Sequence, residues 1–190
     1  VKQENDMETA MDTIFEAADI AIENGDNIII LSDKVVDKDK APIPALLVAS
    51  GLHHHLIRKG TRMKVSIVLE SGEPREVHHF ACLVGYGVNG INPYMAYEAI
   101  KELSDEKLLE YSYEDGVKRF NKACTKGIVK IMSKMGISTI QSYQGAQIFE
   151  ALGISESVVN KYFTGTVTRI GGLSLDQIEK EYLQRMEDAF

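Results

Sequence analysis

The chain has 190 residues, of which 44% are hydrophobic and 26% charged, and this composition excludes a disordered or collagen-like chain. A chain of this length is typical of one domain and buries roughly 70% of the surface that its unfolded form exposes. The 28 acidic residues outnumber the 21 basic ones, and the net charge of −7 argues against a nucleic-acid partner. Because we find neither a membrane-span-length apolar run nor a signal peptide, we expect a cytoplasmic protein with no membrane partner.

The two cysteines set limits on covalent and metal chemistry. Cys82 and Cys124 are too few for a disulfide framework or a zinc site of the usual spacing, and they fit a reducing compartment. A buried structural cysteine is commoner than a reactive one, so we expect no nucleophile at Cys124. The first residue is Val and not Met, which favours a chain processed or cut from a longer one.

The first part of the chain, residues 1–104, alternates apolar β-branched runs with amphipathic segments. Short turns between strands and helices are typical of right-handed βαβ units, so we predict an α/β fold with a parallel sheet, open or a partial barrel. Pro74 and Pro93 fit first helical positions, and Asn92 fits an N-cap. The predicted order is helix 7–22, strand 27–32, helix 45–59, strand 63–69, helix 74–84, strand 88–92 and a helix from residue 93.

Residues 105–190 are predicted to form a helix-rich remainder of the same domain, with one more strand at most. Ser174 and Gln177 form a capping box that predicts the start of the last helix. The apolar stripe of that helix consists of Leu175, Ile178, Tyr182 and Met186. The other predicted elements are a surface connection over 104–114, a basic-faced helix over 117–135, a strand over 136–140 and helices over 144–152 and 158–163.

All five histidines lie in two clusters, His53–His55 and His78–His79, which suggests a metal site. Helical geometry argues against it, since consecutive residues are about 100° apart and three in a row cannot face one ion. One histidine from each cluster, with Glu73 or Glu76, remains an alternative ligand set. We expect helix-flank histidines with ordinary hydrogen bonds.

Gly85-Tyr-Gly87-Val-Asn-Gly90 matches the G-x-G-x-x-G dinucleotide fingerprint letter for letter. That fingerprint binds a pyrophosphate only when a strand precedes it and a helix follows. Here the predicted order is reversed. We therefore interpret these glycines as the end of a helix and the turn into a strand.

Polar residues follow the predicted strands at the edge where parallel sheets bind ligands. Asp33, Glu70 and Asn92 mark these ends and form the candidate pocket. The same residue types also cap strand-to-helix turns, and no nucleophile is paired with a base. We therefore favour capping and assign no catalytic, cofactor-binding or metal-binding residue.

Several segments together resemble the central domain of the glutamate synthase large (alpha) chain. The resemblance runs in order from about Ile28 to Phe190 and rests on many motifs. They include Pro42-Ile-Pro-Ala-Leu-Leu, His53-His-His-Leu-Ile-Arg-Lys-Gly60, Leu69-Glu-Ser-Gly-Glu-Pro-Arg-Glu-Val-His-His-Phe80, Ile91-Asn-Pro-Tyr94, Val129-Lys-Ile-Met-Ser-Lys-Met-Gly-Ile-Ser-Thr139, Gly145-Ala-Gln-Ile-Phe-Glu150 and Phe163-Thr-Gly165.

The resemblance implies a cofactor-free part of a multidomain flavoenzyme that makes glutamate from glutamine and 2-oxoglutarate. In that family an N-terminal glutaminase releases ammonia into an internal tunnel, and a domain with FMN and an iron–sulfur cluster uses it. The central domain resembles the FMN-binding domain, connects the two and helps to wall the tunnel. Val1 stands where the catalytic cysteine would be expected, and the three-cysteine cluster motif is absent. The resemblance therefore implies a fragment without activity of its own.

Two alternatives remain open at this point. The first is a small stand-alone metal-binding enzyme that uses the histidine clusters with Glu70 or Asp33. The second is a ligand-binding module that senses glutamine or 2-oxoglutarate. If part of the domain is missing upstream, an apolar surface is left uncovered and the chain is expected to associate with itself.

Overall fold

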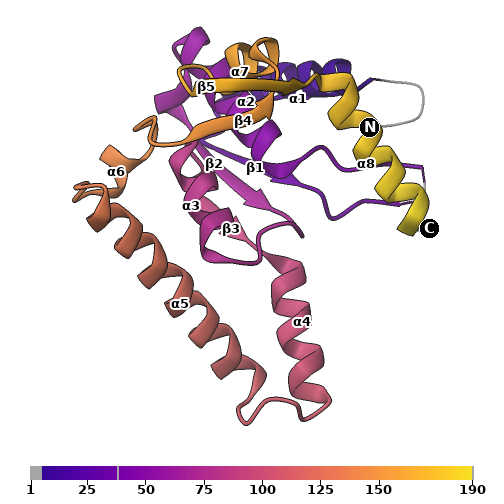
Figure 1. Ribbon diagram of the computed structural model, residues 1–190, viewed down its shortest axis with the longest axis vertical. Coiled ribbons are helices and arrows are strands. Elements are labelled where there is room, and N and C mark those ends of the chain that lie inside the picture. The colour runs from indigo at the N-terminus through magenta and orange to yellow at the C-terminus, as the bar shows by residue number, and fades with distance from the viewer. Residues whose placement is uncertain (1–5, 38, 190) are drawn as a thin grey trace.

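The computed structural model describes residues 6–37 and 39–189, and it confirms an α/β fold with parallel strands (Figure 1). The central sheet has the order β1-β2-β3, formed by Ile28–Ser32, Ser66–Glu70 and Gly90–Asn92. All of its pairings are parallel, with Ile30 opposite Val68 and Val68 opposite Gly90. The sheet is open, and the described residues close no barrel.

The helices of the first half follow the predicted pattern. α2 has the predicted bounds, Ala45–Lys59, and ends at Gly60, whose φ of 72° suits a residue without a side chain. α1 begins after Asp6, whose side chain accepts a hydrogen bond from the backbone N–H of Thr9. The bounds of the others are Met7–Glu23 for α1, Val77–Gly85 for α3 and Tyr94–Asp105 for α4.

The hydrophobic core lies between one face of the sheet and helices α1 and α2. Leu31, Ile67 and Leu69 point from the strands into this core, with exposed fractions of 8% or less. The inner face of α2 packs into this core with side chains that are at most 4% exposed: Ala45, Ala49, Leu52 and Leu56.

The second half contains α5 (Tyr113–Lys134), α6 (Ile140–Tyr143), β4 (Glu150–Ile154), α7 (Glu156–Tyr162), β5 (Val167–Leu173) and α8 (Leu175–Ala189). α4 and α5 form a hairpin that extends away from the rest of the molecule (Figure 1). β4 and β5 form a separate two-stranded parallel sheet, which contacts α7 (Figure 1).

Two predictions for this half are wrong. Residues 136–140 are not a strand: Gly136 ends α5 with a φ of 72°, and Thr139 caps α6 by accepting a hydrogen bond from the backbone N–H of Ser142. Residues 144–152 are not a helix, since Gln147 has a left-handed φ of 53° and the chain then enters β4. At residues 150–152, local propensity favoured a helix, and tertiary pairing with β5 overrode it.

β5 was not predicted because Gly171 and Gly172 lower the strand propensity of its sequence. The structure gives a physical reason for Gly172. A Cβ atom there would lie 2.4 Å from the carbonyl oxygen of Gly153 in the neighbouring strand. Only glycine permits this approach of the two backbones.

Smaller differences concern the ends of elements. α3 begins at Val77 and not at Pro74, and α5 begins at Tyr113, four residues earlier than predicted, with Ser112 as N-cap. Residues 62–64 form a short 3₁₀ helix, so β2 starts at Ser66. The predicted capping box of α8 is confirmed by hydrogen bonds between Ser174 and Gln177 in both directions.

None of the helices in the described part of the chain is long and apolar enough to cross a membrane.

Candidate functional site

The three polar side chains predicted at the strand ends lie at one edge of the central sheet. In the register of the sheet, Ser32 stands opposite Glu70, and Glu70 opposite Asn92. Asp33 follows directly after β1. The parallel strands therefore bring the predicted pocket residues to one edge, as expected from the sheet topology.

Glu70 is held by its two strand neighbours. Its carboxylate accepts hydrogen bonds from the hydroxyl of Ser32 at 2.7 Å and from the side-chain amide of Asn92 at 3.1 Å, and Lys34 lies 3.8 Å away. The hydrogen bond from Ser32, together with Lys34 and Asn92, lowers the pKa of the Glu70 carboxyl. Glu70 therefore stays ionised at neutral pH and is a poor general acid.

Asp33 is held by hydrogen bonds from three residues of the chain. Its carboxylate accepts hydrogen bonds from the hydroxyl of the buried Ser71 at 2.5 Å, the backbone N–H of Gly72 at 3.2 Å and the hydroxyl of Tyr94 at 2.8 Å. Burial and this contact raise the pKa of Tyr94 to about 12, so its hydroxyl remains a donor. Asp33 joins β1 to the loop after β2 and to the start of α4.

These contacts decide what the strand-end cluster can do chemically. The carboxylates of Asp33 and Glu70 are occupied by donors from this chain. The arrangement is that of a network that fixes loops at the sheet edge, which agrees with the capping interpretation.

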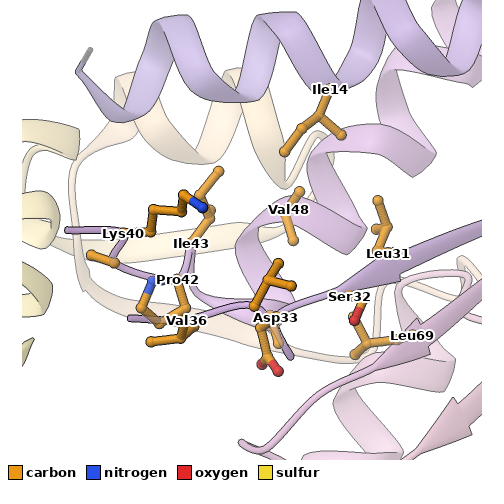
Figure 2. Close-up of a pocket in the computed structure, with 13 residues that line it drawn as sticks. Ile14, Leu31, Ser32, Asp33, Val36, Lys40, Pro42, Ile43, Val48 and Leu69 are labelled. Carbon is orange, nitrogen blue, oxygen red and sulfur yellow. The ribbon is translucent and has the colours of Figure 1, made fainter. Parts of the chain in front are cut away.

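A small cavity of about 240 Å³ lies beside this network, between α1, the end of β1 and the start of α2 (Figure 2). Its walls are mainly aliphatic, while Ser32, Asp33 and Lys40 contribute the polar groups. The carboxylate of Asp33 is bonded to Ser71, Gly72 and Tyr94 and is not free to bind a ligand there. The aliphatic lining residues include Ile14, Leu31, Val36, Ile43, Val48 and Leu69.

Sequence reasoning missed the role of Glu73. Its carboxylate accepts a hydrogen bond from the backbone N–H of Ala45, the first residue of α2, at 3.0 Å, and another from the hydroxyl of Tyr182 in α8 at 2.9 Å. Pro44 offers no side-chain cap, so Glu73 caps α2 from a distant loop. The absence of a Ser, Thr, Asp or Asn before Ala45 was the only sequence signal for such a partner.

A second cavity of about 270 Å³ adjoins Glu73 and reaches Cys82. Burial, with a smaller effect from Glu76, raises the pKa of the Cys82 thiol, and burial also raises that of Cys124. Both cysteines are therefore thiols at neutral pH, in keeping with a structural role.

The histidines do not converge on a common point. His53 accepts a hydrogen bond on Nδ1 from Nε of Arg62 at 2.9 Å, whereas Nε2 of His55 lies 2.9 Å from Asp19. In the second cluster both side chains are exposed, and Nδ1 of His79 accepts from the backbone N–H of Arg75. Among residues 6–37 and 39–189, no group of three His, Cys, Asp or Glu side chains is placed to hold a metal ion.

Burial is the main cause of the lowered pKa values of His53 and His54. It lowers the pKa of His53 to about 4, and Arg62 and His54 add to the effect. Burial and Arg58 lower the pKa of His54 to about 4 as well. Both imidazoles are neutral at pH 7, and His53 is an acceptor within the core rather than an exposed acid or base.

The structure confirms that the G-x-G-x-x-G segment ends a helix and turns the chain into a strand. α3 ends at Gly85, the chain turns at Gly87 with a φ of 95°, and β3 begins at Gly90. A Cβ atom at Gly87 would lie 2.1 Å from Nδ1 of His53. The glycine is required by this contact and by its backbone conformation.

Comparison with known proteins gives a consistent result. Residues 1–155 match the family described as the glutamate synthase central domain. The chain is 53% identical over 185 residues to the NADPH glutamate synthase large chain of Bacillus subtilis, covering 97% of this chain and 12% of that protein. It is 43% identical over 171 residues to the NADH glutamate synthase of Schizosaccharomyces pombe, covering 89% of this chain and 8% of the relative.

A ferredoxin-dependent relative shows a similar match. The glutamate synthase of Pyropia yezoensis is 42% identical over 187 residues, which cover 92% of this chain and 12% of that protein. The chain thus spans about an eighth or less of its curated relatives. It belongs to the glutamate synthase central-domain family.

Proposed function

We propose that this chain acts as a connecting module of a glutamate synthase large chain, without catalytic activity of its own. It would pack between a glutaminase domain and an FMN-binding domain of the parent chain and help to wall the passage for ammonia. The parent enzyme would make glutamate from glutamine and 2-oxoglutarate. The family assignment, the closed hydrogen-bond networks and one exposed apolar sheet face support this proposal.

The observation that carries the proposal is the exposed face of the central sheet, here called the open face, on which Ile28, Ile30 and Val68 lie. Ile28 is 57% and Ile30 is 64% exposed, and Val68 is half-buried. Their strand neighbours Leu31 and Leu69 point the other way and are buried. Purely parallel sheets occur almost only with both faces covered, so this face requires a partner.

The parent chain supplies enough mass to cover the open face. In the Bacillus subtilis relative, the region similar to this chain is 12% of the protein. A domain layer packed on β1 and β2 would bury the two isoleucines, and each buried aliphatic side chain contributes about 1.5–3 kcal/mol. A module held by such an interface positions its neighbours better than a flexible linker does.

The residues present do not fit the iron–sulfur cluster that the family implies. An iron–sulfur cluster is held by about four protein ligands, usually thiolates. This chain has only Cys82 on α3 and Cys124 on α5. The cluster is accordingly proposed for another part of the parent chain, and no chemical step is assigned here.

The exposure of Ile28 and Ile30 also predicts how the isolated chain associates with itself. Two aliphatic side chains side by side on an edge strand are a site for unwanted association. We expect the isolated chain to associate with itself weakly through this face, and this association should persist at high salt because it is apolar.

The test uses a full-length glutamate synthase large chain that contains these residues. Ile30→Asp places a charge in the proposed interface, while Met63→Asp, at a position that is 97% exposed, is the matched control. We expect Ile30→Asp to increase the glutamine hydrolysed per glutamate formed and to release ammonia into solution, and Met63→Asp to leave the ratio unchanged. An unchanged ratio in both variants, with both folded, would refute the connecting role.

The two alternatives from sequence have weaker support. A metal enzyme lacks a ligand cluster among the described residues. In the cavity of Figure 2, Lys40 pairs with Asp37 at 3.6 Å and the carboxylate of Asp33 is bonded within the chain, which gives a sensor of glutamine or 2-oxoglutarate less support. We therefore retain only the connecting module as the proposed function.

A further inference from the structure

Helix α5 carries an unusual concentration of positive charge. Between Gly116 and Phe149 the sequence has six cationic residues and no Asp or Glu, although the whole chain has a net charge of −7. Five lysines recur at every fourth position and are here called the lysine row: Lys118, Lys122, Lys126, Lys130 and Lys134. The row runs about 24 Å along the helix, at a rise of 1.5 Å per residue.

Successive lysines of the row are rotated by about 40°, so the row spans about 160° of the helix surface, and Lys122 and Lys126 at its centre lie most directly opposite the packed side of α5. Gly116, Cys124 and Met132 face the protein and are buried, whereas the five lysines are all exposed. Lys118 pairs with Asp115 at 3.7 Å. Within the described part of the chain, no carboxylate lies within ion-pair distance of Lys122, Lys126, Lys130 or Lys134.

Positive charges four residues apart on a helix repel one another and destabilise it. A purely solvated helix face normally mixes signs, as acidic and basic residues at this spacing attract. An aliphatic side chain lies beside the lysine row, because Val129 directly precedes Lys130 and is 58% exposed. An apolar centre with a charged rim is typical of a protein–protein contact.

A complementary surface is present on α1 of the same chain. Its carboxylate row consists of residues spaced three or four apart, which fall within about 80° of the helix surface: Glu8, Asp12, Glu16, Asp19 and Glu23. Ile20, which is 58% exposed, lies beside this row. The carboxylate row is about 22 Å long, which is close to the length of the lysine row.

Only some carboxylates of the carboxylate row are paired with a cation of the described residues. Lys161 forms ion pairs with both Glu8 at 2.7 Å and Asp12 at 3.5 Å, and Lys59 pairs with Asp19 at 3.5 Å. Glu16 and Glu23 are exposed, and among residues 6–37 and 39–189 no cation lies within ion-pair distance of either. α1 therefore has spare negative charge where α5 has spare positive charge.

We propose that α5 of one copy of this chain docks on α1 of a second copy, with the lysine row against the carboxylate row. Val129 and Ile20 would form the apolar centre of this contact. The rival occupant is a nucleic acid, and the observations disfavour it: α4, which forms the hairpin with α5, carries Glu98, Glu102 and Asp105. These carboxylates would repel a polyanion that extends beyond the row.

The proposal does not rest on the proposed function, because it uses α1 and α5 and not the open face. The two modes of association differ in their response to salt. A contact between charge rows weakens as the Debye length falls from about 14 Å at 50 mM salt to about 4 Å at 500 mM. Association through Ile28 and Ile30 would not weaken in this way.

The experiment is a charge exchange followed by sedimentation equilibrium of the full 190-residue chain. Variant A carries Lys126→Glu and Lys130→Glu, and variant B carries Glu16→Lys and Glu23→Lys. All four positions are exposed, and circular dichroism and thermal unfolding confirm that each variant is folded. The control carries Lys64→Glu and Lys180→Glu, which change the net charge as much as variant A does but lie off the row.

We expect the wild type and the control to associate above the protomer mass of 21.1 kDa at low salt. At high salt the part of this association that depends on the lysine row should be lost, and only the weak association through the open face should remain. Variants A and B alone should each associate at least about tenfold more weakly, and their mixture should recover the association. The mixture is decisive, because only complementary rows on different copies explain recovery.

Three results would overturn the proposal. The first is a wild type that stays monomeric at low salt, and the second is association that variants A and B leave unchanged. The third is the absence of recovery on mixing two folded variants. Binding of a double-stranded DNA oligonucleotide that depends on Lys126 and Lys130, without self-association, would assign the row to nucleic acid instead.

Discussion

Nε of Arg62 donates a hydrogen bond to Nδ1 of His53 at 2.9 Å, and the same guanidinium binds the carbonyl oxygens of Val65 and Gly87. One arginine thus connects α2, the start of β2 and the turn before β3. Because the hydrogen bond requires an unprotonated Nδ1, the contact couples the fold to the neutral form of His53. The histidine that first suggested a metal site is instead part of the core.

This contact predicts an acid-sensitive stability. The pKa of His53 and that of His54 are lowered from 6.5 to about 4 in the folded chain. Between pH 6.5 and pH 4 the unfolded chain binds protons that the folded chain does not, so stability is full above pH 6.5 and falls toward pH 4. We expect His53 to contribute a loss of about 1–3 kcal/mol over this range.

Urea unfolding at several pH values measures this effect. His53→Gln keeps an acceptor for Arg62 but does not titrate, so its free energy of unfolding should depend less on pH between 6.5 and 4. The exposed His78→Gln serves as control and should retain the wild-type slope. An identical slope in wild type and His53→Gln would contradict the role given to His53.

Gly87→Ala tests the close contact between the turn and the imidazole. Gly25 and Gly87 have nearly the same backbone conformation, with φ of 94° and 95°. A Cβ at Gly25 meets nothing within 4 Å, whereas one at Gly87 would lie 2.1 Å from His53. We expect Gly25→Ala to lower the free energy of unfolding by about 1–2 kcal/mol and Gly87→Ala by at least about 2 kcal/mol more. Equal losses would show that the contact with His53 contributes nothing.

Glu73→Ala removes the cap of α2 and the partner of Tyr182 together. We expect a loss of about 2 kcal/mol in the free energy of unfolding, and about 1 kcal/mol for Tyr182→Phe, which removes one hydrogen bond. The double variant should lose less than the sum, because both changes break the same contact. Glu187→Ala, at an exposed position of α8, is the control. Strict additivity of the two changes would indicate that the residues act independently.

Asp33→Ala tests whether the strand-end network is structural. The hydroxyls of Ser71 and Tyr94 and the N–H of Gly72 would lose their acceptor, and Ser71 is fully buried. We expect a loss of about 2–4 kcal/mol in urea unfolding, against less than about 0.5 kcal/mol for the exposed Asp26→Ala. A loss as small as that of Asp26→Ala would contradict a structural role of Asp33.

The first half of the fold was predictable because its signals are local. Pro44 and Gly60 bracket α2, whose bounds match the prediction. The apolar run of β1 predicts a fully buried strand; the strand is confirmed, but of its residues only Leu31 is buried. The strand-end residues Asp33, Glu70 and Asn92 were predicted as a group because parallel topology fixes where strands end. Their division of roles was not predictable, since Ser71 and Tyr94, which bind Asp33, come from other segments.

The second half depends on contacts between distant segments. β4 is a strand only because β5 pairs with it, and Gly172 of β5 is required by its close contact with Gly153 in β4. Glu73 caps a helix 28 residues away in sequence, so no local pattern reveals it. The division of the chain at residues 104 and 105 stays a prediction.

The most direct test of the connecting role is the accessibility of the open face in the parent enzyme. Ile30→Cys and the control Met63→Cys are introduced into this chain and into a full-length large chain that contains it, and the rate of thiol modification is measured. Both positions should react readily in the isolated chain. In the full-length chain, Cys at position 30 should react at least about tenfold more slowly and Cys at position 63 at an unchanged rate. Equal reactivity of position 30 in both chains would show that nothing covers the open face and would contradict the account.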